Sequence, residues 1–340
     1  MAKAWPVPGL NPDDTFRSAA GKVISTRSAE VLAYQRTVLI EGGVDHVHDL
    51  RVSIRRLRAN FDAFRDVFER PAYEARRARL RDLASKLGEV RDADVMAGML
   101  AGRLDEAGSE PLRAALRVLR SEALGEAEAG RAERLEASAG DALGAAIADL
   151  AEYVGEVTSV TAARLGLPWP DPPPAPVPPE PVPHRDRRVR ADPDAQVGPG
   201  LWELFTWRLR RVRRADDAAL AAAPDDSDEL HQLRIAIKRV RYIGEVGALV
   251  LPDGGADDLL DKLSDLQDEL GDVHDADVLT GVAEEHRAAG DSAPPAGWTE
   301  LTGQLAVDRA ESREKALGML EELRPDNWKA VRAPFRPLQD

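Results

Sequence analysis

Two blocks of the sequence each combine a histidine with a row of basic residues. HDLRVSIRRLR occupies residues 48–58, and HQLRIAIKRVR occupies residues 231–241. Arginine stays charged at any physiological pH, and its planar guanidinium donates two hydrogen bonds to one phosphate group. The two blocks therefore predict a surface that binds a phosphate-containing anion. The residues predicted to bind it are His48, Arg51, Arg55, Arg58, His231, Arg234, Lys238 and Arg241.

A helical conformation would place each row on one ridge. At 100° per residue, the basic row of the first block falls within an arc of about 80°, and apolar residues such as Leu50, Ile54 and Leu57 fall within a separate arc. Asp45 and Asp228 occupy matching positions and are expected to be N-caps. They would place each histidine in the first turn of its helix, where free N–H groups favour anions.

A second pair of blocks lies downstream of the first. LGEVRDADVM at 87–96 recurs as LGDVHDADVL at 270–279, and both pairs of blocks are separated by 183 residues, which predicts an internal duplication. Asp94 and Asp277 fall on an apolar stripe, so we expect structural residues that pair with an arginine of the basic helix in their own half. Gly88 and Gly271 are expected to allow close helix approach.

Helical periodicity dominates the 340 residues, and no convincing strand pattern occurs. We expect an all-α protein made of two pseudo-symmetric antiparallel helical bundles that arose from an internal duplication. The first repeat would occupy 13–166, a proline-rich linker 167–199, and the second repeat 200–325, with ten prolines between positions 168 and 183. The expected helices are 13–41, 45–69, 72–107 and 110–165, the last broken near Gly140, followed by 200–222, 229–249, 256–289 and 296–323.

The composition excludes several classes of protein. The absence of cysteine excludes a disulfide framework, a thiolate metal site and a cysteine nucleophile. Residues 1–10 do not resemble a signal peptide, and no stretch is apolar enough to cross a membrane, so we expect a cytoplasmic protein. A net charge of −14 and an aromatic content of 5% argue against binding to nucleic acid or to an anionic membrane.

Six further basic residues are weaker candidates for the same surface. They form three pairs at matching positions of the two halves. For the first and last pairs, a solvated or ion-paired side chain is the simpler interpretation. The pairs are Arg27 with Arg210, Arg56 with Arg239, and Arg79 with Lys262.

The order of the motifs resembles a known family. An HxLRVxxRRLR block followed by LGxxRDADV, present twice in an all-helical chain, is similar to the CHAD domain, the conserved histidine α-helical domain. The resemblance covers roughly residues 13–325. It implies two helical bundles around a basic groove that binds inorganic polyphosphate, with the binding residues at the eight positions named above. The ExExK motif of the triphosphate tunnel (CYTH) domain, which accompanies many relatives, is not found, so the chain is interpreted as a stand-alone CHAD domain.

Other functions stay open at this stage. His48-Asp49 and His274-Asp275 resemble the dyads of metal-dependent phosphohydrolases, but Asp49 aligns with Gln232 and His274 with Arg91. We therefore expect no enzyme, no catalytic residue, no metal and no cofactor. Specific nucleic-acid binding is a weaker alternative, as is a helical scaffold whose basic rows contact a protein partner. The preferred function is non-catalytic binding of inorganic polyphosphate, with association with a storage granule as a further possibility.

Overall fold

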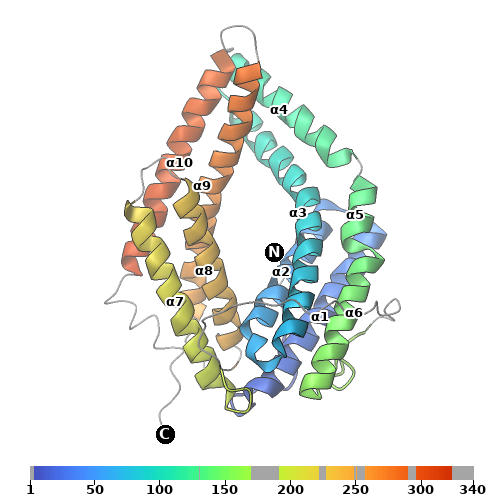
Figure 1. The fold of residues 1–340 in the computed structure, drawn as a ribbon. Helices are drawn as coiled ribbons and strands as arrows, with labels where there is room; N and C mark the ends of the chain where they lie inside the picture. The colour runs from blue at the N-terminus through green and yellow to red at the C-terminus, as the bar shows by residue number, and fades with distance from the viewer. Residues whose placement is uncertain are drawn as a thin grey trace.

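The computed structural model describes residues 4–129, 131–169, 191–221, 227–248, 250, 257–289 and 296–323. Within these residues the regular structure is helical, apart from one isolated bridge between Thr15 and Gln196. This confirms the expected all-α fold (Figure 1). The duplication itself stays an interpretation of the sequence, and the prolines at 170–183 lie outside the described residues.

The helices follow the predicted order, with one difference. The first half contains α1 (Phe16–Glu41), α2 (Val44–Ala63), a short 3-10 helix (Arg65–Val67), α3 (Arg70–Glu106), α4 (Glu110–Glu128), α5 (Arg131–Ala139) and α6 (Asp141–Thr158). The second half contains α7 (Val197–Ala221), α8 (Ser227–Ala248), α9 (Asp257–Ala289) and α10 (Ala296–Glu322). The break expected near Gly140 in the helix at 110–165 is confirmed, because Gly140 is the N-cap of α6. The sequence did not predict the earlier break, where α4 ends at its C-cap Ala129, so three helices occupy this segment instead of two.

Short polar and glycine residues set the helix ends. The Thr15 hydroxyl accepts a hydrogen bond from the Ser18 N–H at the start of α1, and Gly42 ends that helix with a φ of 64°. The prediction that Asp45 and Asp228 are N-caps is wrong. Gly43 is the N-cap of α2, and both aspartates lie inside the first turn of their helices. Their carboxylates still complement the partial positive charge of those turns.

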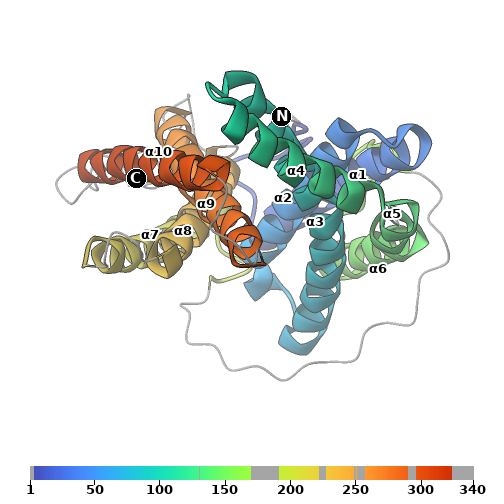
Figure 2. The same cartoon turned by 90° about the horizontal axis from the view of Figure 1, so that it is seen from above.

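The helix packing forms a closed circuit. Neighbouring helices pack in the order α2, α3, α4, α10, α9, α8, and α8 returns to pack on α2. The base of this ring is the α2–α8 contact, and the apex is the α4–α10 contact (Figures 1 and 2). Two separate apolar clusters support the two contacts. The base cluster includes Leu50, Ile54, Leu233 and Ile237, and the apex cluster includes Leu100, Leu112, Leu116, Leu279, Leu301 and Leu305.

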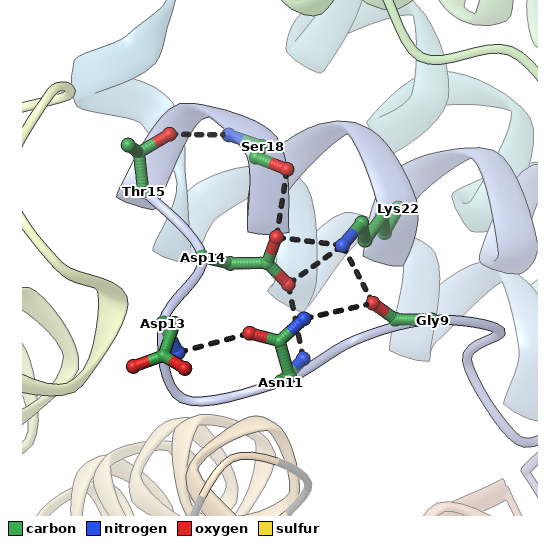
Figure 3. A network of polar contacts seen from close by, with 7 residues as sticks. All are labelled: Gly9, Asn11, Asp13, Asp14, Thr15, Ser18 and Lys22. Atoms are coloured by element: carbon green, nitrogen blue, oxygen red, sulfur yellow. Dashed lines mark hydrogen bonds and ion pairs between the residues drawn. The ribbon is translucent and has the colours of Figure 1, made fainter.

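A short backbone pairing also ties the two halves together at the base. The Phe16 N–H donates to the Ala195 carbonyl at 2.8 Å, and the Val197 N–H donates to the Asp14 carbonyl at 2.9 Å. The Asp14 side chain anchors the N-terminal segment, because its two carboxylate oxygens lie 2.6 and 2.8 Å from the Lys22 ammonium (Figure 3). The starts of α1 and α7 are thereby held side by side, which positions α2 against α8.

Candidate anion-binding site

Five cationic side chains from α2 and α8 act on one another at the base of the ring. Burial, followed by the charges of Arg234, Arg55, Arg51 and Arg241 in that order, lowers the pKa of Lys238 to about 7. Burial also lowers the pKa of Arg55 and of Arg234. A cation loses its proton more easily where water is excluded and like charges surround it. We call Arg51, Arg55, Arg234, Lys238 and Arg241 the central cluster.

Three carboxylates lie next to the central cluster and offset part of its charge. Arg51 donates to Asp92 at 2.6 Å, and Arg241 lies 3.5 Å from Glu245 on the same helix. Burial raises the pKa of Asp275, although Arg234 and Lys238 act in the opposite direction. Five cations against three carboxylates leave a net positive charge when Lys238 is protonated. The Arg51 and Glu245 pairs are also partly exposed, so water screens them.

Tyr242 is part of the same region, although the sequence analysis did not identify it. Its side chain is buried, and the guanidiniums of Arg55 and Arg241 lie 5.8 and 5.3 Å from the centre of its ring. Stacking of this kind restrains guanidiniums while leaving their N–H edges able to donate. The position that matches Tyr242 in the first half is Ala59, so a search for paired residues could not detect it.

One predicted histidine, His231, lies beside the cluster together with His274 of α9. The rings of His231 and His274 lie 5.4 Å apart, which brings α8 and α9 together beside Arg234. Burial, followed by the charges of Arg234, His231 and Lys238, lowers the pKa of His274. His48 is half-buried on α2, three residues before Arg51. Both predicted histidines lie in the second turn of their helices rather than the first, because α2 begins at Val44 and α8 at Ser227.

Arg58 does not belong to the central cluster, which corrects the predicted row. The charges that act on it after burial are Asp62, Arg77, Arg81 and Arg239. Arg77 donates to Asp62 at 2.8 Å, and the Tyr73 hydroxyl donates to the same carboxylate at 2.5 Å. The structure therefore places Arg58 in a second basic region, where several arginines surround one aspartate.

Two of the weaker candidates are buried ion-pair residues, so their placement on the binding surface was wrong. Glu30 is fully buried and accepts from Arg27 at 2.6 Å and from Arg56 at 3.0 Å. Arg27 is only 3% exposed and Arg56 only 8%. Charged groups become this buried when a partner of opposite charge satisfies them. These two arginines stabilise the α1–α2 contact and lie out of reach of a surface ligand.

The remaining candidates are placed differently from one another. Lys262 pairs with Asp258 at 3.3 Å on the exposed side of α9, Arg79 is half-buried on α3, and Arg210 is exposed on α7. None of these three is among the charges that lower the pKa of Lys238 most. Arg239 is exposed and lines a groove between α7 and α8.

Asp94 and Asp277 pair with arginines, but not with those of the basic helices. Arg131 of α5 donates to Asp94 at 2.7 Å, and Arg309 of α10 donates to Asp277. The predicted pairing with an arginine of α2 or α8 is therefore wrong. Each aspartate instead holds the long third helix of its half against a later helix, since a carboxylate on a partly buried face needs such a donor.

The two glycines of the second block do not bring helices unusually close. A side chain at Gly271 would meet open space, and one at Gly88 would make only ordinary contact with Arg51 and Asp92. The predicted role in close approach is therefore wrong. Gly88 contributes through its carbonyl, which accepts from the Arg51 guanidinium at 3.3 Å.

Among the described residues, no group of three or more His, Asp or Glu side chains is placed to hold a metal ion. Within that same part of the chain, no helix is both long and apolar enough to span a membrane.

Comparison with known proteins identifies the class. The sequence matches the CHAD domain family over residues 23–284, and the chain belongs to this family. Its fold is similar to the crystal structure of the CHAD domain from the plant Ricinus communis, with a TM-score of 0.59, 20% identity, and coverage of 100% of this chain and 96% of that one. It is also similar to PptA from Streptomyces chartreusis, with a TM-score of 0.56, 20% identity, and coverage of 93% and 99%. No curated protein matches the chain.

Proposed function

We propose that this protein binds inorganic polyphosphate at the central cluster and does not catalyse a reaction on it. The observation that carries the proposal is the surroundings of Lys238. All four charges that contribute most to lowering its pKa are arginines, supplied by two helices from opposite halves of the chain. Such a group of cations is unfavourable by itself and becomes favourable when a polyanion neutralises it.

The chemistry of the cluster favours phosphate over other anions. Four of the five cations are arginines, whose paired N–H groups match the spacing of phosphate oxygens. Since these residues come from both α2 and α8, successive phosphates of a linear chain can each find a donor. The family resemblance points in the same direction.

Two alternatives are less well supported. A metal-dependent hydrolase needs a metal-bound water or a general base next to the substrate. The described residues offer no three-ligand metal group, and the charged neighbours of His274 are mainly cationic. Nucleic-acid binding would use the same arginines for phosphate contacts. The net charge of −14 and the shortage of aromatic side chains do not favour it.

Titration with long-chain polyphosphate tests the proposal. Wild type should bind tightly, and a variant with Arg51→Ala, Arg55→Ala, Arg234→Ala and Lys238→Ala should lose most of the affinity while keeping its helical content. RNA should compete poorly, and the phosphate chain length should be unchanged after incubation with Mg²⁺ or Mn²⁺. Equal binding by both proteins would refute the site, and shortening of the chain would refute the absence of catalysis.

A further inference from the structure

The groove between α7 and α8 carries a concentration of positive charge separate from the central cluster. It has a volume of about 260 Å³, and its lining includes Arg208, Arg211 and Arg214 of α7 and Arg239 of α8, with Glu229 as the lining carboxylate. Arg211, Arg214 and Arg239 are exposed. Among the described lining residues, four arginines against one glutamate form a strongly basic patch on a chain whose net charge is −14.

The groove lies on a different side of α8 from the central cluster. The groove is lined by Gln232, Ala236 and Arg239 of α8, whereas the central cluster uses Arg234, Lys238 and Arg241. At 100° per residue, the mean directions of these two sets differ by roughly 160° around the helix axis. The charges with most influence on Lys238 do not include a groove arginine. The two basic regions are therefore distinct sites on opposite sides of one helix.

The corresponding helix pair of the first half shows what is unusual about the groove. Arg56 of α2 matches Arg239 by the 183-residue separation, and it is neutralised by the buried Glu30 of α1. Burial lowers the pKa of Arg239, Asp62 of α2 raises it, and Arg211, the α7 charge that acts on it, lowers it. Arg56 thus meets a carboxylate on the neighbouring helix α1, whereas the α7 charge that acts on Arg239 is a second arginine.

The helices that pack on α1 and on α7 also differ between the two halves. In the first half, α6 packs along α1 and covers one side of it (Figure 1). The principal neighbours of α7 are α8 and the start of α1, so the outer side of α7 keeps its arginines in contact with solvent (Figure 2). Within the described part of the chain, no further helix is a principal neighbour of α7, and Arg211, Arg214 and Arg239 are exposed at the groove.

The lining indicates what kind of ligand fits. Its apolar lining consists of Ala215, Ala218 and Ala236 with one larger residue, Ile235, and offers little surface to the large apolar anchors that dominate protein interfaces. The guanidiniums of Arg208 and Arg211 lie 4.6 and 5.3 Å from the centre of the Trp207 ring, which restrains them by cation–π contact. Restrained guanidiniums around a small groove suit a compact, multiply charged anion with phosphate geometry.

We propose that the α7–α8 groove is a second phosphate-binding site, independent of the central cluster and peculiar to the second half of the chain. Its occupant is a short run of phosphate groups, which comes either from a free short chain such as tripolyphosphate or from the end of a long chain held at the central cluster. The second source rests on the proposed function, whereas the first does not.

Calorimetric titration with tripolyphosphate tests the site. Wild type should bind at two sites, and the double variant Arg211→Gln, Arg239→Gln should retain only one. The matched control is Arg210→Gln, Arg213→Gln, which removes two exposed arginines of α7 that do not line the groove. The control should keep both sites with less than a twofold change in affinity. Retention of both sites by the groove variant, or equal losses in the groove and control variants, would overturn the proposal.

Two further measurements identify the source of the phosphate groups and test a competing ligand. If the groove variant also binds long-chain polyphosphate at least fivefold more weakly, the occupant is the end of the long chain; if that affinity is unchanged, it is a free short chain. A polyglutamate of similar charge that displaced tripolyphosphate from the groove would instead identify an acidic protein segment and overturn the phosphate assignment. Failure of the proposed function is distinguishable, since the Arg55→Gln, Lys238→Gln variant would then bind long chains as wild type does.

Discussion

Arg234 lies one helical turn before Lys238 on α8, and after burial its guanidinium is the charge that most lowers the pKa of Lys238, to about 7. A bound polyanion favours the charged ammonium, so it raises this pKa and the complex takes up a proton. The uptake occurs at pH values above the pKa of the free protein. The titrating group of the site near neutral pH is therefore Lys238.

This coupling predicts how affinity depends on pH. Between pH 6 and pH 8 the affinity for long-chain polyphosphate should fall about tenfold, since one group with a pKa near 7 must be protonated in the complex. The comparison is Lys238→Arg, which keeps the charge but removes the titration, so its affinity should change less over the same range. Parallel pH profiles for the two proteins would contradict the role of Lys238.

Salt dependence should report the number of phosphate contacts. Each neutralised phosphate releases counterions, so the slope of log affinity against log salt should become shallower by about 0.7–0.9 when one contact is removed. Arg234→Gln should show this change, and Arg210→Gln, on the exposed side of α7, should leave the slope for the central cluster unaltered. Affinity that is flat in salt for wild type would be incompatible with an electrostatic site.

The buried group around Glu30 should be a determinant of stability. Glu30→Ala leaves two buried arginines without their shared carboxylate and should lower the free energy of unfolding by about 3–5 kcal/mol, measured by urea denaturation. Lys262→Ala removes an exposed pair with Asp258 and should change stability by less than about 0.5 kcal/mol. Similar effects of the two substitutions would contradict the structural role of the Glu30 group.

The Asp94–Arg131 pair can be tested as a unit. Asp94→Leu and Arg131→Leu should each destabilise the protein, and the double variant should be less destabilised than the sum of the two, with a coupling of about 0.5–3 kcal/mol. Affinity of the folded variants for polyphosphate should stay within about twofold of wild type. A large loss of affinity in a stably folded Asp94→Leu variant would show that the aspartate acts on the ligand.

The basic helices and most of the central cluster could be predicted because local periodicity determines which side of a helix is buried. Leu50, Ile54 and Leu57 define the core side of α2, and all three are fully buried. Arg51 and Arg55 follow from that assignment, and the same reasoning holds for α8.

Residue partners could not be predicted, since they depend on where one helix meets another. Arg58 shares a side of α2 with Arg55, but it meets a different turn of α8 and lies beside Arg239 instead of Arg241. Arg56 looked like a surface residue because nothing local reveals Glu30, 26 residues earlier on α1. Asp94 reaches an arginine on α5, a helix that the sequence pattern did not separate from α4.

The α4–α10 contact closes the circuit of helices that begins at α2 and α8. The facing surfaces of α4 and α10 belong to one molecule, so the other helices of the circuit hold them at a high effective concentration. A modest apolar contact is therefore enough to keep these two helices together. The two halves cannot swing apart to relieve the mutual repulsion of Arg51, Arg55, Arg234, Lys238 and Arg241 unless the apex also separates. The apolar contacts at the apex, which include Leu112 and Leu301, therefore help to hold the five cations at a fixed spacing. These residues act on the central cluster although they lie far from its charges.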